Sequence, residues 1–240
     1  PPRRRHPGRV LRPQLPAIGT LVSVWLGGRI GTHADTRPLM PVIAVIDDGV
    51  GNLRAVGKAL LHVAPDAQIV VSGDPAVIRE AARVVLPGQS AMPDSMAGLD
   101  ATGLRGVVLA CLRDRPLLGV RLGLQMLFDL SEEGPTACLG ALPGRVRRFR
   151  EEDLNVSGDR LKIPHMGWSP VRQTHAHPLW AGIPDGERFY FAHSSYPVPA
   201  DPALTPGPQA YPTPFTCAIA RANTFALQFH PEKTPDPGLP

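Results

Sequence analysis

Short runs of apolar residues alternate with amphipathic stretches through the first half of the chain. Apolar runs of four or five residues bounded by turn residues are typical of buried strands, and apolar residues spaced three and four apart indicate helices. The pattern predicts strands at 42–46, 67–71, 84–86 and 116–120, alternating with helices at 53–63, 75–82, 104–112 and 122–130. Such alternation predicts βαβ units and a parallel sheet.

From residue 145 onward the pattern changes to shorter β segments, of which 188–192, 216–220 and 225–229 are the clearest. We therefore expect an α/β fold with a central, mostly parallel sheet flanked by helices and a mixed β extension. In open α/β sheets, functional groups gather beyond the carboxyl ends of the strands. Gly49, Gly88 and Arg121 each follow a predicted strand and should lie there.

Length and composition predict one α/β domain at residues 40–234, a basic leader at 1–39 and an irregular tail at 235–240. The leader holds seven arginines and one acid, so the rest of the chain is mildly acidic although the formal net charge is +4. Because the excess positive charge lies in the leader, we expect no nucleic-acid partner. The Arg-rich beginning of the leader resembles that of a transit or secretory peptide. The favoured alternative is that Met40 is the first residue of the protein. No membrane span is expected in the leader.

The three cysteines, Cys111, Cys138 and Cys217, show no paired spacing. Such cysteines suit a reducing compartment, so we expect a cytoplasmic protein without disulfides. Neither a metal-ligand pattern nor a cofactor motif is visible, and we expect no metal and no cofactor.

The segment Gly119-Val120-Arg121-Leu122-Gly123 has the frame of a nucleophile elbow. In that motif a sharp turn between a strand and a helix presents the central side chain, and the flanking glycines allow the chain to bend and pack closely. The central residue occupies a strained conformation. Here it is an arginine, which cannot attack a carbonyl carbon.

Near the C-terminus, Phe229-His230-Pro231-Glu232 follows a predicted strand. A carboxylate two residues from a histidine can orient the imidazole as a general base. The elbow and this segment together resemble class I glutamine amidotransferases. Further segments narrow the resemblance to the glutaminase subunits of imidazole glycerol phosphate synthase, an enzyme of histidine biosynthesis: residues 46–53, 86–88, 164–168 and 193–196, and the Glu-Lys pair after His-Pro.

This resemblance implies a role for each matching position. Arg121 stands at the nucleophile position, where a cysteine is expected, His230 is the general base and Glu232 orients it. Gly88, Gln89 and Ser90 form the oxyanion loop, although the family commonly has a second glycine where Ser90 stands. The implied glutamine contacts are Gln125, Glu133, His193, Ser194 and Ser195. The implied contacts with the synthase partner are Asn52, Pro164, Met166 and Trp168, and Ser169 replaces a family asparagine.

Plainer interpretations remain for three of these positions. The alternatives are an ordinary Pro-Gly turn at Gly88, a solvated charge beside Glu132 at Glu133, and a core position at Trp168.

The resemblance implies a subunit that supplies ammonia from L-glutamine to a cyclase subunit of (β/α)₈ barrel type in a heterodimer. Arg121 predicts that the glutaminase step is disabled, because removing a triad nucleophile costs several powers of ten in rate. Two alternatives are a non-catalytic subunit that stabilises or regulates an ammonia-using cyclase, and a class I amidotransferase of another pathway.

Overall fold

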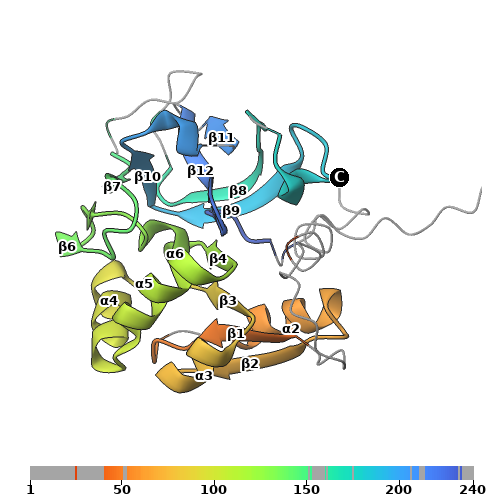
Figure 1. Cartoon of the computed structure of the whole chain (residues 1–240). Coiled ribbons are helices and arrows are strands. Elements are labelled where there is room, and N and C mark those ends of the chain that lie inside the picture. Colours follow the sequence, from red (N-terminus) through yellow and green to blue (C-terminus); the bar gives the residue numbers. More distant parts are fainter. Residues whose placement is uncertain are drawn as a thin grey trace, which may run out of the picture.

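The computed structural model describes residues 25, 41–50, 53–150, 152, 160, 162–174, 176–205, 207–210, 214–231 and 233. The central sheet has the strand order β11-β12-β13-β4-β3-β1-β2 (Figure 1). Five strands run parallel: β1 (Val42–Ile46), β2 (Gln68–Ser72), β3 (Arg83–Leu86), β4 (Leu117–Val120) and β13 (Thr224–Leu227). β12 (Pro214–Arg221) and β11 (Gly207–Ala210) extend it antiparallel. The predicted α/β fold with a mostly parallel sheet is confirmed.

Helices cover both faces of this sheet, because successive side chains of a strand point to opposite faces. On one face, Ile43 and Val45 of β1 pack with Val56 and Leu60 of α2 (Arg54–Val63). On the other face, Ala44 and Ile46 belong to a second buried cluster that includes residues of three helices. These helices are α3 (Pro75–Glu80), α4 (Met92–Ala101) and α5 (Leu104–Asp114).

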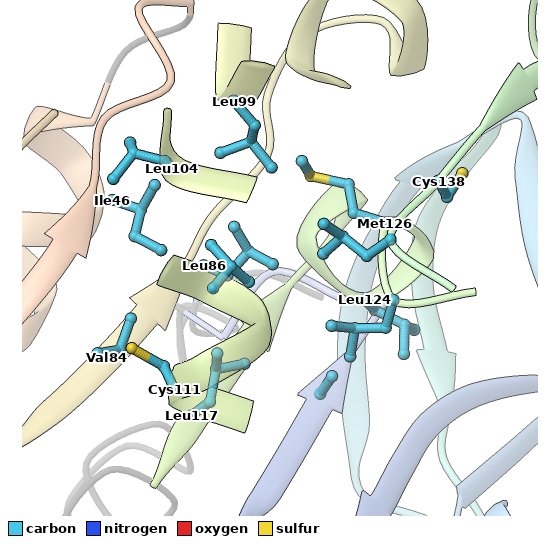
Figure 2. Close-up of a cluster of buried hydrophobic side chains, with 14 of the residues drawn as sticks. Ile46, Val84, Leu86, Leu99, Leu104, Cys111, Leu117, Leu124, Met126 and Cys138 are labelled. Carbon is cyan, nitrogen blue, oxygen red and sulfur yellow. The ribbon is translucent and has the colours of Figure 1, made fainter. Parts of the chain in front are cut away.

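This second cluster reaches the start of the short helix α6 (Leu122–Gln125), which directly follows β4 (Figure 2). Leu86, Leu117 and Leu124 have no more than 1% of their surface exposed. The predicted elbow therefore lies over a fully packed core.

A smaller β layer contains the remaining described strands. One sheet has the order β10-β7-β5-β6, and β8 and β9 form a separate antiparallel pair. Their bounds are β5 (Leu130–Ser131), β6 (Thr136–Ala137), β7 (Gly144–Arg148), β8 (His165–Pro170), β9 (Arg188–His193) and β10 (Ser195–Pro199). In Figure 1, β8, β9 and β10 lie at the top of the view, and β1 and β2 lie at the bottom. Two short 3₁₀ helices, Pro178–Trp180 and Pro202–Leu204, complete the described elements.

The predicted helix 122–130 is wrong in its extent, because α6 ends at Gln125 and Leu130 already begins β5. Residues 126–128 are all fully buried, so they cannot share one face of a surface helix. Their carbonyl groups accept hydrogen bonds from the later segment 139–142 instead of continuing the helix. Tertiary packing therefore overrides a continuous apolar run.

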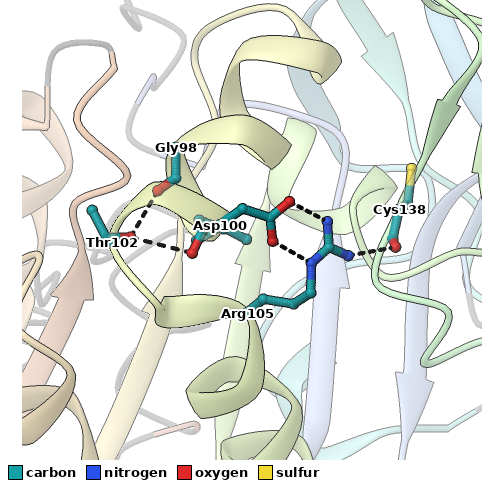
Figure 3. Close-up of polar contacts among 6 residues, drawn as sticks. Gly98, Asp100, Thr102, Arg105 and Cys138 are labelled. Carbon is teal, nitrogen blue, oxygen red and sulfur yellow. Dashed lines mark hydrogen bonds and ion pairs between the residues drawn. The ribbon is translucent and has the colours of Figure 1, made fainter.

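Helix α4 was not predicted, because Pro93 and Gly98 interrupt its pattern. Gly98 has a packing reason, since a Cβ there would lie 2.1 Å from the carbonyl oxygen of Asp48. After α4, the Arg105 guanidinium joins Asp100 to the carbonyl oxygen of Cys138, at 2.9 Å from each of the accepting atoms Oδ2 and O (Figure 3). This contact attaches the segment after β6 to helices α4 and α5.

Among the described residues, no single helix is long and apolar enough to cross a membrane. Only α4 and α5 taken together reach that length and composition, and they are bent by 94°.

The predicted leader and tail lie outside the described residues except for Trp25. That side chain is 6% exposed, and its ring centroid lies 5.3 Å from the guanidinium carbon of Arg83. Met40, Asn52 and Glu232 also lie outside the described residues.

Candidate functional site

Arg121 occupies the turn between β4 and α6 with φ 59° and ψ −115°. This conformation falls outside the regions that residues with a Cβ ordinarily adopt, although it suits glycine. The Arg121 backbone N–H donates to the carbonyl oxygen of Leu227 at 2.7 Å, so the turn is attached to the end of β13. The elbow backbone expected from the sequence is present.

The two flanking glycines permit this attachment. A Cβ on Gly123 would lie 1.9 Å from the carbonyl oxygen of Leu86, and one on Gly119 would lie 2.7 Å from Cβ of Ala226. Real Cβ atoms do not approach other atoms so closely. The elbow is therefore wedged between β3 and β13, and no larger residue fits at either glycine without a shift of the backbone.

A cavity of about 290 Å³ opens beside the elbow. It brings together all of the residues that the sequence assigned to the oxyanion loop and to glutamine binding. Its lining residues are Gly88, Gln89, Ser90, Arg121, Leu122, Gln125, Glu133, Arg148, Pro164, Ala192, His193, Ser194, Ser195 and Gln228. Segments from β3, α6, β9 and β13, which are far apart in the sequence, therefore meet at one cavity.

The loop after β3 packs directly on the start of α6. A Cβ on Gly88 would lie 2.4 Å from Cβ of Leu122, so a glycine is needed at this contact. The hydroxyl of Ser90 lies 2.6 Å from that of Ser95, a fully buried residue of α4. This hydrogen bond attaches the loop to a helix, which gives Ser90 a structural role that its replacement of a glycine did not indicate.

The buried side chain of Gln125 forms one wall of the cavity. Its Nε2 donates to the carbonyl oxygen of Ser195 at 3.0 Å and to Oε1 of Gln228 at 2.8 Å. Gln228 was not predicted. It precedes Phe229 and His230 in the segment that carried the resemblance, and this neighbourhood was the only signal for it. Arg148 at the end of β7 was also missed, because only the pairing of β7 with β10 brings it to the cavity.

His193 lies at the end of β9, with 7% of its surface exposed. Its pKa is lowered to about 3, chiefly by burial; the hydrogen bond with Ser195 opposes this shift, and the nearby charges of His165, Arg121 and His230 add to it. His165, its cross-strand partner on β8, has a pKa lowered to about 4 by burial. Both rings are therefore neutral near pH 7 and can each donate and accept one hydrogen bond.

His230 does not line the cavity. It is 6% exposed, and its backbone N–H donates to the carbonyl oxygen of Tyr190 at 2.9 Å. The effect of the Arg121 and His230 charges on His193 places all three in one electrostatic neighbourhood. The orienting role expected of Glu232 falls outside the described residues and stays a prediction.

The residues assigned to partner contact behave differently from one another. Met166 on β8 is 63% exposed, the largest exposed fraction among the exposed large apolar side chains in the described part of the chain. Pro164 is exposed and also lines the cavity, whereas Trp168 is half-buried, with its ring centroid 5.5 Å from that of Tyr190. Strand β8 therefore presents an apolar side chain outward next to the cavity.

None of the three cysteines replaces the nucleophile. Cys111 is buried in α5, Cys138 just after β6 and Cys217 in β12, and none of them lines the cavity. Burial raises the pKa of each thiol, that of Cys138 to about 11. A buried thiol of high pKa is a poor source of thiolate. Among the described residues, no group of three or more His, Cys, Asp or Glu side chains could hold a metal ion.

Comparison with known proteins agrees with this geometry. The family model of class I glutamine amidotransferases matches residues 44–239. A solved structure of a glutamine amidotransferase from Thermotoga maritima superposes with a TM-score of 0.56 at 16% identity, covering 81% of this chain and 77% of that one. At that identity the superposition shows the shared fold alone. The fold and the elbow thus define a protein of the class I glutamine amidotransferase type.

Two relatives narrow the class. "Imidazole glycerol phosphate synthase subunit HisH" of Thiobacillus denitrificans is 56% identical over 82% of this chain and 87% of that protein. The subunit of the same name from Dechloromonas aromatica is 57% identical over 82% of this chain and 92% of that protein. The chain therefore belongs to the HisH family of class I glutamine amidotransferases.

Strain at the elbow should be measurable by substitution. We expect Arg121→Gly to be more stable than Arg121→Ala by about 1 kcal/mol, because only glycine adopts φ 59°, ψ −115° without a steric penalty. Comparing the two variants cancels the loss of the arginine side chain. Urea unfolding monitored by circular dichroism measures the difference in the free energy of unfolding.

The matched control is the exposed helical residue Lys58 on α2. There the order should reverse, with Lys58→Ala more stable than Lys58→Gly by roughly 1 kcal/mol. An Arg121→Ala variant as stable as Arg121→Gly would contradict a strained elbow.

Stability should fall in mild acid because of the buried His165 and His193. Their folded-state pKa values of about 4 and about 3 lie below the ordinary 6.5, so the unfolded chain binds more protons as the pH falls below 6.5. We expect the free energy of unfolding to drop between about pH 7 and 5 by on the order of 1–2 kcal/mol for each ring. The dependence on pH should be smaller in His165→Asn. If the free energy of unfolding of His165→Asn depends on pH as strongly as that of the unmodified chain, this assignment is contradicted.

Proposed function

We propose that this chain is the glutamine amidotransferase subunit of an imidazole glycerol phosphate synthase of histidine biosynthesis, with its glutaminase step disabled at residue 121. The relatives at 56% and 57% identity support the pathway. The single observation that carries the disabled step is an arginine on the strained elbow, facing a cavity lined by the expected glutamine-binding residues.

The chemistry expected of the family begins with attack of a cysteine thiolate on the side-chain carboxamide of L-glutamine. A histidine takes the thiol proton and later gives it to the departing ammonia, which leaves a glutamyl thioester for hydrolysis. A guanidinium stays protonated in proteins and has no lone pair available for attack. With Arg121 at the elbow, the thioester cannot form, and the remaining groups can only bind and polarise glutamine.

A cyclase subunit of (β/α)₈ barrel type is the proposed partner, in a heterodimer. The exposed apolar side chain of Met166 and the exposed Pro164 support a docking surface along β8. Because Pro164 also lines the cavity, the proposed surface and the glutamine cavity are adjacent.

A second candidate function follows from the same arginine. If the glutaminase step is lost while the fold and the cavity persist, the chain can still stabilise or regulate a cyclase that takes ammonia from solution. The packed elbow and the folded β8–β9 pair favour this non-catalytic subunit over an unfolded remnant. An amidotransferase of another pathway is disfavoured by relatives that share the HisH name.

Glutaminase activity tests the proposal directly. In complex with its cyclase, the chain should release no ammonia from L-glutamine above background, and Arg121→Cys should raise the rate by at least about 10³-fold. A coupled glutamate assay measures both rates.

Arg121→Ser is the matched control, because it removes the guanidinium and supplies a hydroxyl but no thiol. It should stay near background. Robust turnover by the unmodified chain would show that Arg121 does not disable the site.

Partner binding can be tested apart from catalysis. Met166→Asp should weaken the complex with the cyclase by at least about tenfold, because it places a charge in an apolar contact. Leu61→Asp on α2 is the control, since Leu61 is also an exposed apolar residue, at 52%, and should leave affinity unchanged. Titration calorimetry measures both affinities, and equal weakening by the two variants would contradict docking through β8. If the complex also speeds a cyclase supplied with ammonium salts, the second candidate function gains support.

A further inference from the structure

A second cavity, of about 430 Å³, lies at the opposite end of the central sheet from Arg121. It is lined by residues of α5, of the segment 141–142 and of the turn between β12 and β13, and we call it the distal cavity. Thr224 in its lining pairs with Leu117 at the start of β4, whereas the elbow follows Val120 at the end of that strand. The distal cavity and the candidate functional site share no lining residue. The distal cavity is therefore a separate site.

The floor of the distal cavity is apolar. Leu109 and Leu112 of α5 pack against the second buried cluster of the core, and Leu142, 4% exposed, belongs to that cluster. Cavities of roughly 300–1,000 Å³ with mostly apolar walls are typical of sites for small organic molecules. Such a floor favours a ligand with an apolar body over an inorganic ion.

One buried hydroxyl lies within this floor. Thr224 is 6% exposed, and its side chain lies on the same face of β13 as that of Ala226, because alternate residues of a strand share a face. Ala226 belongs to the same cluster as Leu142. Within the described part of the chain, the hydroxyl of Thr224 has no hydrogen-bond partner. It is therefore available to a polar group of a ligand.

Two guanidinium groups also line the distal cavity. Arg113 lies in the last turn of α5, and Arg221, at the end of β12, donates from Nη1 to the carbonyl oxygen of Ala141 at 3.2 Å. Neither guanidinium forms an ion pair with any carboxylate among the described residues. The described lining contains no Asp or Glu, and Asp114, next to Arg113, is exposed and does not line the cavity. The positive charge of the lining therefore favours an anion.

The wall that carries Arg221 is held from two sides. Ala222 and Asn223 form the turn that joins β12 to β13. Asn223 Nδ2 donates to the carbonyl oxygen of Arg115 at 2.6 Å, and the carbonyl oxygen of Asn223 accepts from the N–H of Leu117 at 3.0 Å. The turn is thus attached to the end of α5 and to the start of β4. A wall that is already in place lowers the cost of ordering on binding.

We propose that the distal cavity binds a small organic acid, a carboxylate whose apolar body is about the size of a phenyl ring. The apolar body rests on the leucine floor, and the carboxylate pairs with Arg113 and Arg221. The hydroxyl of Thr224 supplies a further hydrogen-bond donor. Guanidinium groups suit this ligand, because they form strong charge-assisted hydrogen bonds with carboxylates.

Titration calorimetry of the full chain tests the class of ligand with 3-phenylpropionate and its neutral amide, 3-phenylpropanamide. We expect the carboxylate to bind with a Kd of about 1 mM or tighter, and the amide to bind at least about tenfold more weakly. Inorganic phosphate should also bind at least about tenfold more weakly, because it has no apolar body to bury. No binding of the carboxylate, or equal affinity for the carboxylate and either of the other probes, would overturn the proposal.

Substitutions test where the acid binds. Arg113→Gln and Arg221→Gln should each weaken binding of 3-phenylpropionate about threefold to tenfold, and Thr224→Val, which keeps the shape of the side chain, about threefold. Arg145→Gln is the matched control, because Arg145 is an exposed arginine of β7 that lines neither cavity. It should leave the affinity unchanged.

Arg121→Ser separates the two cavities, because the candidate functional site also contains an arginine. This variant should bind 3-phenylpropionate as the unmodified chain does. If Arg121→Ser weakens binding as much as Arg113→Gln, or if Arg113→Gln and Arg221→Gln both leave it unchanged, the acid binds elsewhere and the proposal is wrong. None of these measurements depends on glutaminase activity, so failure of the proposed function leaves them unaffected.

Discussion

The approach of Gly123 to the carbonyl of Leu86 is the contact on which the centre of this protein depends. A single methyl group at residue 123 would lie 1.9 Å from that oxygen, so the turn after β4 can sit between β3 and β13 only with a bare backbone there. In this position the Arg121 N–H donates to the carbonyl oxygen of Leu227, and the loop at Gly88 packs on Leu122. The cavity exists because these three segments meet.

This constraint acts on the backbone, so it does not depend on which side chain residue 121 carries. An arginine accepts φ 59°, which costs on the order of 1–3 kcal/mol, because packing on both sides over-determines the turn. Fold and reactivity are therefore separable here. The backbone geometry of the elbow is present with an arginine at its centre. Family membership follows from the fold and the relatives, whereas reactivity depends on the side chain.

The polar side of the cavity follows a different rule. Its buried groups are stable where donors meet acceptors. His165, His193 and Gln125 Nε2 meet that condition in one run of hydrogen bonds that ends at the Ser195 carbonyl oxygen. Gln125 Oε1, by contrast, is buried with no hydrogen-bond partner among the described residues. Through His165, strand β8, which also carries the exposed Met166, contacts this buried run.

Local sequence patterns were sufficient for features that depend on near neighbours along the chain. The strand at 42–46 begins and ends where predicted, and the spacing of Gly119 and Gly123 around Arg121 foretold the strained turn. Non-local contacts decided the rest. Helix α6 stops at Gln125 because residues 139–142 take the next carbonyl groups, and Arg148 reaches the cavity through the pairing of β7 with β10. The register of β8 against β9 alone sets His165 opposite His193, since pairing between strands distant in sequence depends on how the whole β layer packs.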